Sequence, residues 1–155
     1  MEEIEKTWLA GLVDGEGTIT ILRHRVKGRN KALFRPLLCI TNSNLEILQR
    51  CKAITGVGEI YQQKRQELHY RQVHRWMVSD GKAVSIILEI RPYLIAKRRQ
   101  AEIVCNLSSF KGIRGDEAYM IRASLWEEVK SVNKSPMNYQ KSEYKSEKMG
   151  CAYEQ

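Results

Sequence analysis

The sequence has no apolar run near the roughly 20 residues that a membrane-spanning helix requires. Its four cysteines are widely spaced without a C-x-x-C pair, and its three histidines form no H-E-x-x-H motif. This pattern argues against a structural zinc site and favours buried or free thiols. Glu2, Glu3 and Glu5 stand where a signal peptide would carry positive charge before an apolar run. We therefore expect an intracellular chain, in the cytoplasm, nucleoid or an organelle, with no membrane partner.

Positive charge is in excess, and it is confined to one part of the chain. The 155 residues carry a formal net charge of +8. Residues 18–78 hold twelve Lys and Arg against three Glu, whereas the rest of the chain is close to neutral. A merely soluble basic protein would spread its charge over every exposed face. Charge gathered in one block favours a nucleic acid partner, whose phosphates bind Lys and Arg.

The length suits one domain with one sizeable core, which we place at residues 1–132. Apolar periodicity and turn signals predict a helix ending near Gly15, strands over 18–25 and 33–41, a helix from a Ser43–Glu46 capping box to about residue 55, strands over 59–64 and 69–78, and helices over 80–90, 94–107 and 116–132. This order predicts an α+β fold, αββαββα, with a four-stranded antiparallel sheet backed by helices and open to DNA on its other face. Residues 133–155 are expected to be a polar tail, partly disordered or lying on a surface.

Two of the predicted strands have features that the alternating pattern alone does not explain. Pro36 predicts an edge position or a bulge for its strand, because proline cannot donate a ladder hydrogen bond. In the strand over 69–78, polar residues fall on both faces. The pattern therefore leaves open whether Arg75 or Trp76 points to the core.

One stretch, Trp8-Leu9-Ala10-Gly11-Leu12-Val13-Asp14-Gly15-Glu16-Gly17, reads as a helix that stops abruptly. Gly11 and Gly15 lie one turn apart, so one face lacks bulk and another backbone can approach it closely. Glu16 follows the helix end, where carbonyls carry partial negative charge, and its carboxylate therefore calls for a nearby cation. Asp14 is expected to hydrogen-bond the turn rather than bind a metal.

These ten residues resemble the LAGLIDADG motif, the signature of a family of intron- and intein-encoded homing endonucleases. The resemblance extends through the order of elements to about Val132. No second copy of the motif follows Gly17, and single-motif members of the family are homodimers. The resemblance therefore implies a homodimer that cuts both strands of a long, nearly palindromic DNA site by metal-dependent phosphodiester hydrolysis. Packing through Trp8, Gly11, Leu12 and Gly15 would bring two Glu16 carboxylates together.

Glu16 and the carbonyl oxygen of Gly15 are the expected metal ligands. Mg²⁺ is the expected ion, since it prefers one or two carboxylates with phosphate oxygens and waters. Mn²⁺ is the alternative, and Ca²⁺ is expected to bind without supporting cleavage.

The resemblance also implies two further catalytic residues. The family's water-positioning polar side chain falls on Asn42, which helix capping would explain equally well. Its phosphate-stabilising lysine falls on Lys97, whose alternative is a solvated lysine in a basic run. Members of the family often have a basic residue about one helical turn after the position of Asn42. In this sequence that residue is Glu46, which departs from the family pattern.

Alternation along the strands selects seven side chains that are predicted to read bases in the major groove. They are Thr20, His24, Arg35, Tyr61, Gln63, Gln72 and His74. The alternative for each is an ordinary solvent-exposed strand residue. Lys27, Arg29 and Lys31, in the loop between the first two strands, are expected to contact phosphates.

Two other functions stay open for this sequence. One is an intron maturase, which would bind RNA and assist splicing. The other is a DNA-binding regulator that keeps the fold but has lost catalysis. The presence of Glu16 and Lys97 argues against this regulator. Sheet geometry favours B-DNA over the narrow major groove of RNA helices.

Overall fold

The structure is a computed structural model, and it describes residues 1–28, 30–63 and 71–134. Its elements are α1 (Glu3–Glu16), β1 (Gly17–His24), β2 (Leu33–Asn42), α2 (Leu45–Thr55), β3 (Glu59–Gln62), β4 (His74–Ser79), α3 (Asp80–Ile90), the short 3₁₀ helix η1 (Arg91–Tyr93), α4 (Arg98–Ser109) and α5 (Asp116–Lys134). The four strands form one antiparallel sheet in the order β1-β2-β4-β3. The predicted α+β order is confirmed.

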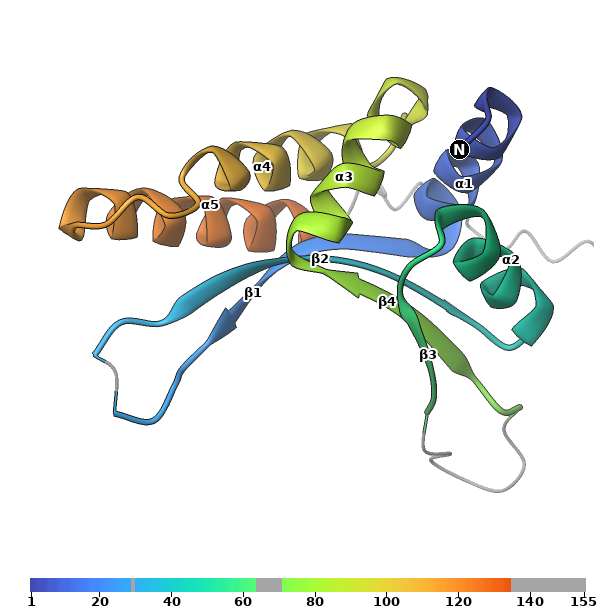
Figure 1. Ribbon diagram of the computed structural model, residues 1–155, viewed down its shortest axis with the longest axis horizontal. Helices are drawn as coiled ribbons and strands as arrows, with labels where there is room; N and C mark the ends of the chain where they lie inside the picture. Colours follow the sequence, from blue (N-terminus) through green and yellow to red (C-terminus); the bar gives the residue numbers. More distant parts are fainter. Residues whose placement is uncertain (29, 64–70, 135–155) are drawn as a thin grey trace, which may run out of the picture.

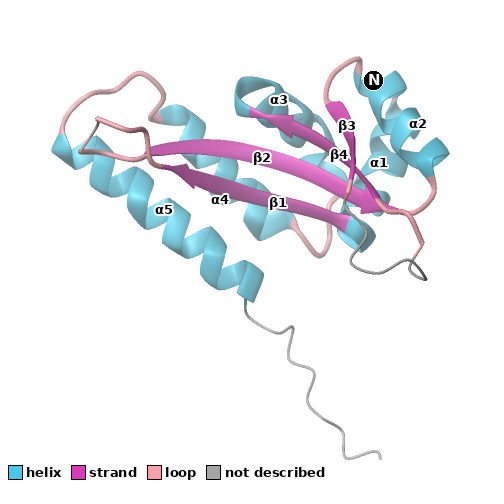
Figure 2. Cartoon of the chain, turned by 90° about the horizontal axis from the view of Figure 1, so that it is seen from below, coloured by secondary structure: helices cyan, strands magenta, loops and turns pink. Residues whose placement is uncertain are grey.

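The sheet arches beneath the helices, and its two hairpins reach downward on either side (Figure 1). Figure 2 shows the uncovered side of the sheet, with the strands in front of the helices. The core lies between the covered face and the helices. It includes Ile19, Leu38 and Trp76 from three strands, all fully buried. We call the uncovered side the open face.

The strand register settles which β4 residues face the core. Trp76 lies opposite Ile40 and is fully buried, and its indole N–H donates to the carbonyl of Val57 at 3.1 Å. Because alternate residues of a strand point to opposite faces, Arg75 belongs to the open face. Its Nε donates to the hydroxyl of Thr41 at 3.2 Å. The phase that the sequence left open is therefore fixed by the burial of the largest side chain.

Pro36 does not mark an edge strand or a bulge, because β2 is an inner strand paired in regular register. Pro36 lies opposite Ile21 of β1, but the pairing of β2 with β4 begins only at Leu37, opposite Ser79. Among the described residues, no strand pairs with β2 on the β4 side between Leu33 and Pro36. Pro36 thus lies in a part of β2 that is paired on one side only. The prediction of an edge position or a bulge is wrong for β2 as a whole.

Helix α2 begins one residue later than the predicted capping box. Asn44, not Ser43, is the N-cap, and its side-chain oxygen accepts from the backbone N–H of Glu46 at 2.9 Å. At the other end Gly56 adopts a left-handed conformation with φ of +66°, which ends the helix as glycine commonly does.

Helix α4 begins at Arg98 rather than at residue 94. Pro92 lies in η1, and the backbone N–H groups of Ile95 and Lys97 donate to the carboxylate of Asp14. The segment before α4 therefore hydrogen-bonds to α1 instead of continuing a helix.

Strands β3 and β4 are shorter than predicted, and residues 64–70 between them lie outside the described residues. Helix α5 runs two residues past the predicted domain end, to Lys134, and residues 135–155 lie outside the described part. The proposed division into domain and tail stays a prediction. Across the described residues, no helix is both long and apolar enough to cross a membrane.

Candidate catalytic centre and nucleic-acid interface

The catalytic acid expected from the sequence stands at the junction of α1 and β1. Glu16 is the last residue of α1 and is exposed. The chain turns directly into β1 at Gly17, where an added Cβ would lie less than 3.0 Å from the backbone of Val13. A side chain cannot be accommodated there without moving the helix. The last glycine of the motif thus allows the acid to stand between helix and sheet.

Asn42 contacts Glu16 directly. It is the last residue of β2, and its side-chain amide donates to the Glu16 carboxylate. Its own oxygen accepts from the backbone N–H of Asn44 at 2.7 Å, which fixes the orientation of the amide. Asn42 is not the cap of α2, and its role in positioning a water stays a prediction. One oxygen of Glu16 is held, and the carboxylate remains exposed.

Lys97 lies at the same end of α1. Its ammonium donates to the carbonyl oxygen of Asp14 at 2.6 Å, where a helix end carries partial negative charge. The Asp14 carboxylate accepts from the backbone N–H of Ile95 at 2.7 Å and of Lys97 at 2.9 Å. Asp14 thus accepts hydrogen bonds from the turn before α4. The sequence led us to expect these bonds from the turn directly after its own motif. Both of its carboxylate oxygens are occupied, so Asp14 orients Lys97.

A hard cation fits the donor atoms at this end of α1, although one chain supplies few of them. Glu16 provides a carboxylate oxygen, and Gly15 beside it is exposed, with nothing within 4 Å of an added Cβ. Oxygen ligands of this kind suit Mg²⁺ or Ca²⁺. No group of three His, Cys, Asp or Glu side chains able to hold a metal occurs among the described residues. A complete site would therefore need donors from outside this chain.

The outer face of α1 is bare and apolar. Leu9, Ala10 and Val13 point inward and are fully buried. On the other side, Gly11 and Gly15 have nothing within 4 Å of an added Cβ, and Trp8 is 40% exposed. Leu12 flanks this face and is half-buried against the core. The four residues predicted for a dimer contact thus lie on or beside a surface that residues 1–28, 30–63 and 71–134 leave uncovered.

Most of the predicted base-reading residues lie on the open face. Register with the buried residues of each strand puts Thr20 and His24 of β1, Arg35 of β2 and Tyr61 of β3 there. Gln63 follows β3, and its amide oxygen, oriented toward Arg75, accepts from the guanidinium at 2.8 Å.

His74 contradicts the prediction. It lies two residues from Trp76 in the same strand and therefore belongs to the covered face, opposite Asn42. Its Nδ1 atom is buried without a partner within the described structure. Gln72 precedes β4, so alternation does not apply to it, and its amide donates to the carbonyls of Gln63 and Val73. The residues that take the open-face positions of β4 are Arg75, Met77 and Ser79, which the sequence did not select.

The basic loop is only partly described. Lys27 is exposed, and Arg29 lies outside the described residues. Lys31 forms an ion pair with Asp116 and stands 5.6 Å from the ring centre of Tyr119. Lys31 is therefore tied to the start of α5, and a phosphate would have to compete with Asp116 for it.

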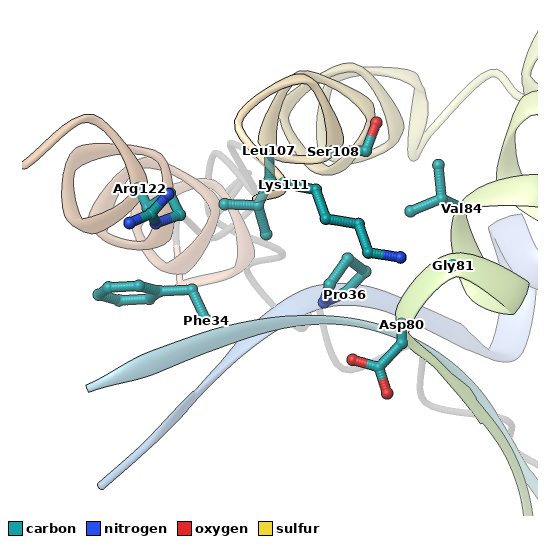
Figure 3. A pocket seen from close by; sticks show the side chains of 9 residues that line it. All are labelled: Phe34, Pro36, Asp80, Gly81, Val84, Leu107, Ser108, Lys111 and Arg122. Carbon is teal, nitrogen blue, oxygen red and sulfur yellow. The ribbon is translucent and has the colours of Figure 1, made fainter. Parts of the chain in front are cut away.

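A cavity of about 280 Å³ lies on the covered side of the sheet, away from Glu16 (Figure 3). Apolar side chains such as Phe34, Pro36 and Val84 line much of it. It contains none of the residues predicted for catalysis or DNA reading. The site at the end of α1 and the open face are therefore the functional surfaces supported by both sequence and geometry.

Comparison with known proteins agrees with this arrangement. The LAGLIDADG endonuclease family model matches residues 9–106. No curated protein sequence matches the chain. The homing endonuclease I-CvuI in complex with the I-CreI target in the presence of Mg superposes with a TM-score of 0.74 at 24% identity, over 87% of this chain and 85% of that chain. I-CvuI in complex with its own target in the presence of Ca gives 0.73 at 25% identity, over 86% and 85%.

A third similar structure is the archaeal intron-encoded homing endonuclease I-Vdi141I complexed with DNA. It superposes with a TM-score of 0.72 at 17% identity, over 91% of this chain and 90% of that chain. The fold and the single glycine-lined acidic helix define the class of endonuclease that the motif indicated. The chain belongs to the LAGLIDADG endonuclease family.

Proposed function

We propose that this chain is a site-specific homing endonuclease that acts as a homodimer and cuts both strands of a long, nearly palindromic DNA site. The observation that carries the proposal is the position of Glu16. Its carboxylate is exposed at the end of α1 and oriented by Asn42, and it lies beside the bare face of Gly11 and Gly15.

The homodimer follows from the number of acids. The chain has one motif and one exposed acid at this position, whereas two strands must be cut. Trp8, Gly11, Leu12 and Gly15 would form the contact, since small residues allow two helix backbones to approach closely. A twofold axis through this contact would bring the two Glu16 carboxylates near each other. It would also give the protein the symmetry of a palindromic site.

Duplex DNA fits the open face. The sheet is arched, with a hairpin on either side, and its open face carries polar and charged side chains, among them Thr20, His24, Arg35 and Arg75. A two-stranded ribbon can enter the major groove. The structures of I-CvuI and I-Vdi141I contain bound DNA, which supports the same use of the sheet here.

The proposed cofactor is Mg²⁺, with Mn²⁺ as a substitute and Ca²⁺ as an ion that binds without supporting cleavage. Glu16 and the carbonyl of Gly15 would hold it, together with the same atoms of the second chain. When bound, the ion would supply charge neutralisation and an activated water for hydrolysis. The I-CvuI structures obtained with Mg and with Ca support a divalent ion.

The chain's own residues would orient the reaction. Asn42 holds one oxygen of Glu16 and would position a water beside it. Lys97 carries a positive charge at the end of α1, where it would stabilise the negative charge that develops on the phosphate. Glu46 stands where relatives often have a basic residue, and we propose that Arg98, adjacent to Lys97, supplies that charge.

The test is the variant Glu16→Gln, which keeps the size of the side chain and its hydrogen bonding but removes the charge. We expect it to bind the same DNA as the wild type and to cleave it at least about a hundredfold more slowly, because a neutral amide is a poor Mg²⁺ ligand. Target sites would be selected from a random duplex library. Cleavage at the wild-type rate would remove Glu16 from the metal site.

A further inference from the structure

Arg35 and Asp80 form a paired contact on the open face. Arg35 lies opposite Leu22 in the sheet, and Asp80 follows the last residue of β4. The Nε atom of Arg35 donates to Oδ1 of Asp80 at 2.9 Å, and its Nη2 atom donates to Oδ2. Nη2 also lies 3.5 Å from the hydroxyl of Ser79. Both side chains remain about half exposed.

This contact uses one edge of the guanidinium and leaves another. A guanidinium is a rigid planar fork with five N–H donors, so its two edges can pair with two different acceptors. Asp80 occupies the edge formed by Nε and Nη2. Among the described residues, no partner contacts Nη1, so the edge formed by Nη1 and Nη2 is engaged only by the long 3.5 Å hydrogen bond from Nη2 to Ser79.

The backbone of Asp80 indicates that the contact has a purpose beyond local stability. Asp80 has a φ of +60°, the single positive value outside glycine in the described chain. Asp and Asn adopt this conformation more readily than other non-glycine residues, and here it places the Asp80 carboxylate against Arg35. Its carboxylate points away from the cavity under the helices (Figure 3). The hydrogen bond from Arg35 is the main cause of the lowered pKa of Asp80, which matches the paired geometry of the two side chains.

The surroundings of Arg35 suit the edge of a base pair. Arg35 lines a hollow of about 340 Å³ on the open face, together with the apolar side chains of Leu22, Leu37 and Met77. Lys82 also lines this hollow. Glu59, Tyr61 and Ser79 line it as well, so the hollow has both apolar and polar walls, as the edge of a base pair does. A guanidinium restrained in such a place loses little further conformational entropy when it binds.

We propose that Arg35, held in position by Asp80, reads one guanine in the major groove of each DNA half-site. The free edge of the guanidinium matches the O6 and N7 acceptors of guanine, a pairing that no other base offers there. Arg35 is then a specificity-determining residue, and Asp80 is a positioning residue that does not contact the DNA. The inference rests on the proposed function, since it requires duplex DNA on the open face.

The test is a selection of bound duplexes from a random library, made with the Glu16→Gln protein so that the result does not depend on cleavage. We expect a G at one position of each half-site. Adding Arg35→Ala should abolish the preference at that position and leave the others. Adding Asp80→Asn, which tolerates a positive φ but lacks the charge, should weaken the same preference. Lys82→Ala is the matched control from the same hollow, and it should weaken binding to all sequences alike.

A chemical substitution in the DNA sharpens the test. Replacing the selected guanine by 7-deazaguanine removes the N7 acceptor, and we expect affinity to fall about tenfold for the protein with Arg35 and not at all for Arg35→Ala. A guanine preference that survives Arg35→Ala would overturn the role of Arg35. An Asp80→Asn variant that only loses thermal stability, with an unchanged preference, would overturn the role of Asp80. A protein that selects no duplex at all would refute the proposed function itself, and with it the role of Arg35.

Discussion

At the scale of single residues, the catalytic end of α1 is held by hydrogen bonds from distant parts of the chain. Asn42 arrives from β2 and contacts Glu16, while Lys97 arrives from the start of α4 and contacts Asp14. Each bond fixes a polar group that the proposed hydrolysis would use. The acid itself stays exposed, which leaves it free to bind an ion.

Asn42 provides the residue-scale prediction. Asn42→Ala removes the donor that orients Glu16, and we expect cleavage to slow about 10- to 100-fold, as is typical when a residue that supports a metal ligand is lost. DNA affinity should stay the same. Single-turnover cleavage and binding titrations measure the two effects separately.

Asn42→Gln is the matched variant, since it retains the amide and should recover part of the rate. If Asn42→Ala cleaved as fast as the wild type, Asn42 would have no place in the mechanism.

Sequence reasoning found Glu16 from the motif alone, because an acid between a helix end and a glycine is a local feature. Asn42 and Lys97 came from the family resemblance, and their contacts with α1 depend on segments 26 and 83 residues away. His74 was misplaced because alternation cannot assign faces when both faces are polar. The size of Trp76 was the available signal, since its burial determines the phase of the whole strand.

At the scale of elements, the ends of helices were harder to predict than their existence. Ser43 and Asn44 are both good cap residues, and the sequence alone does not decide between them. In the structure the cap is Asn44, whose side-chain oxygen accepts from the Glu46 backbone N–H. The backbone N–H of Asn44 in turn donates to the side-chain oxygen of Asn42. The start of α4 was missed for a related reason, since its preceding N–H groups bond to Asp14, far away in sequence.

The cap of α2 gives a prediction with a built-in control. Asn44→Ala should lower the free energy of unfolding by about 1 kcal/mol, because the Glu46 N–H loses its acceptor. Ser43→Ala should change it by less than about 0.5 kcal/mol, since Ser43 is exposed and outside the helix. Urea denaturation of the two variants measures both. A larger loss for Ser43→Ala would restore the predicted capping box.

The turn between α2 and β3 gives a second prediction at this scale. Gly58 has a φ of +91°, and an added Cβ would lie less than 3.0 Å from Trp76 and Val78. Gly58→Ala should therefore lower the free energy of unfolding by about 3 kcal/mol or more, since strain and a clash with the core add together.

Gly56→Ala is the control for strain alone. Gly56 has a φ of +66°, but open space surrounds its added Cβ, and the expected loss is about 1 kcal/mol. Thermal or chemical denaturation compares the two variants. Equal losses of unfolding free energy in the two variants would mean that Trp76 and Val78 move to accommodate the methyl group added at position 58.

At the scale of the whole molecule, the proposed working unit consists of two chains. Its sheet offers one arched surface, and its motif offers one acid. The apolar face of α1 is left bare by the other described residues, with Trp8 40% exposed beside two glycines. The central claim is that a second copy covers this face and thereby brings the two Glu16 side chains together.

The most direct measurement is the mass of the protein bound to its selected DNA, by sedimentation. We expect two chains per duplex, hence twice the 18.0 kDa chain mass in protein. Gly11→Leu, which places a bulky side chain on the bare face, should give a monomer that no longer cuts both strands. A wild-type protein that binds and cleaves its site as one chain would contradict the claim.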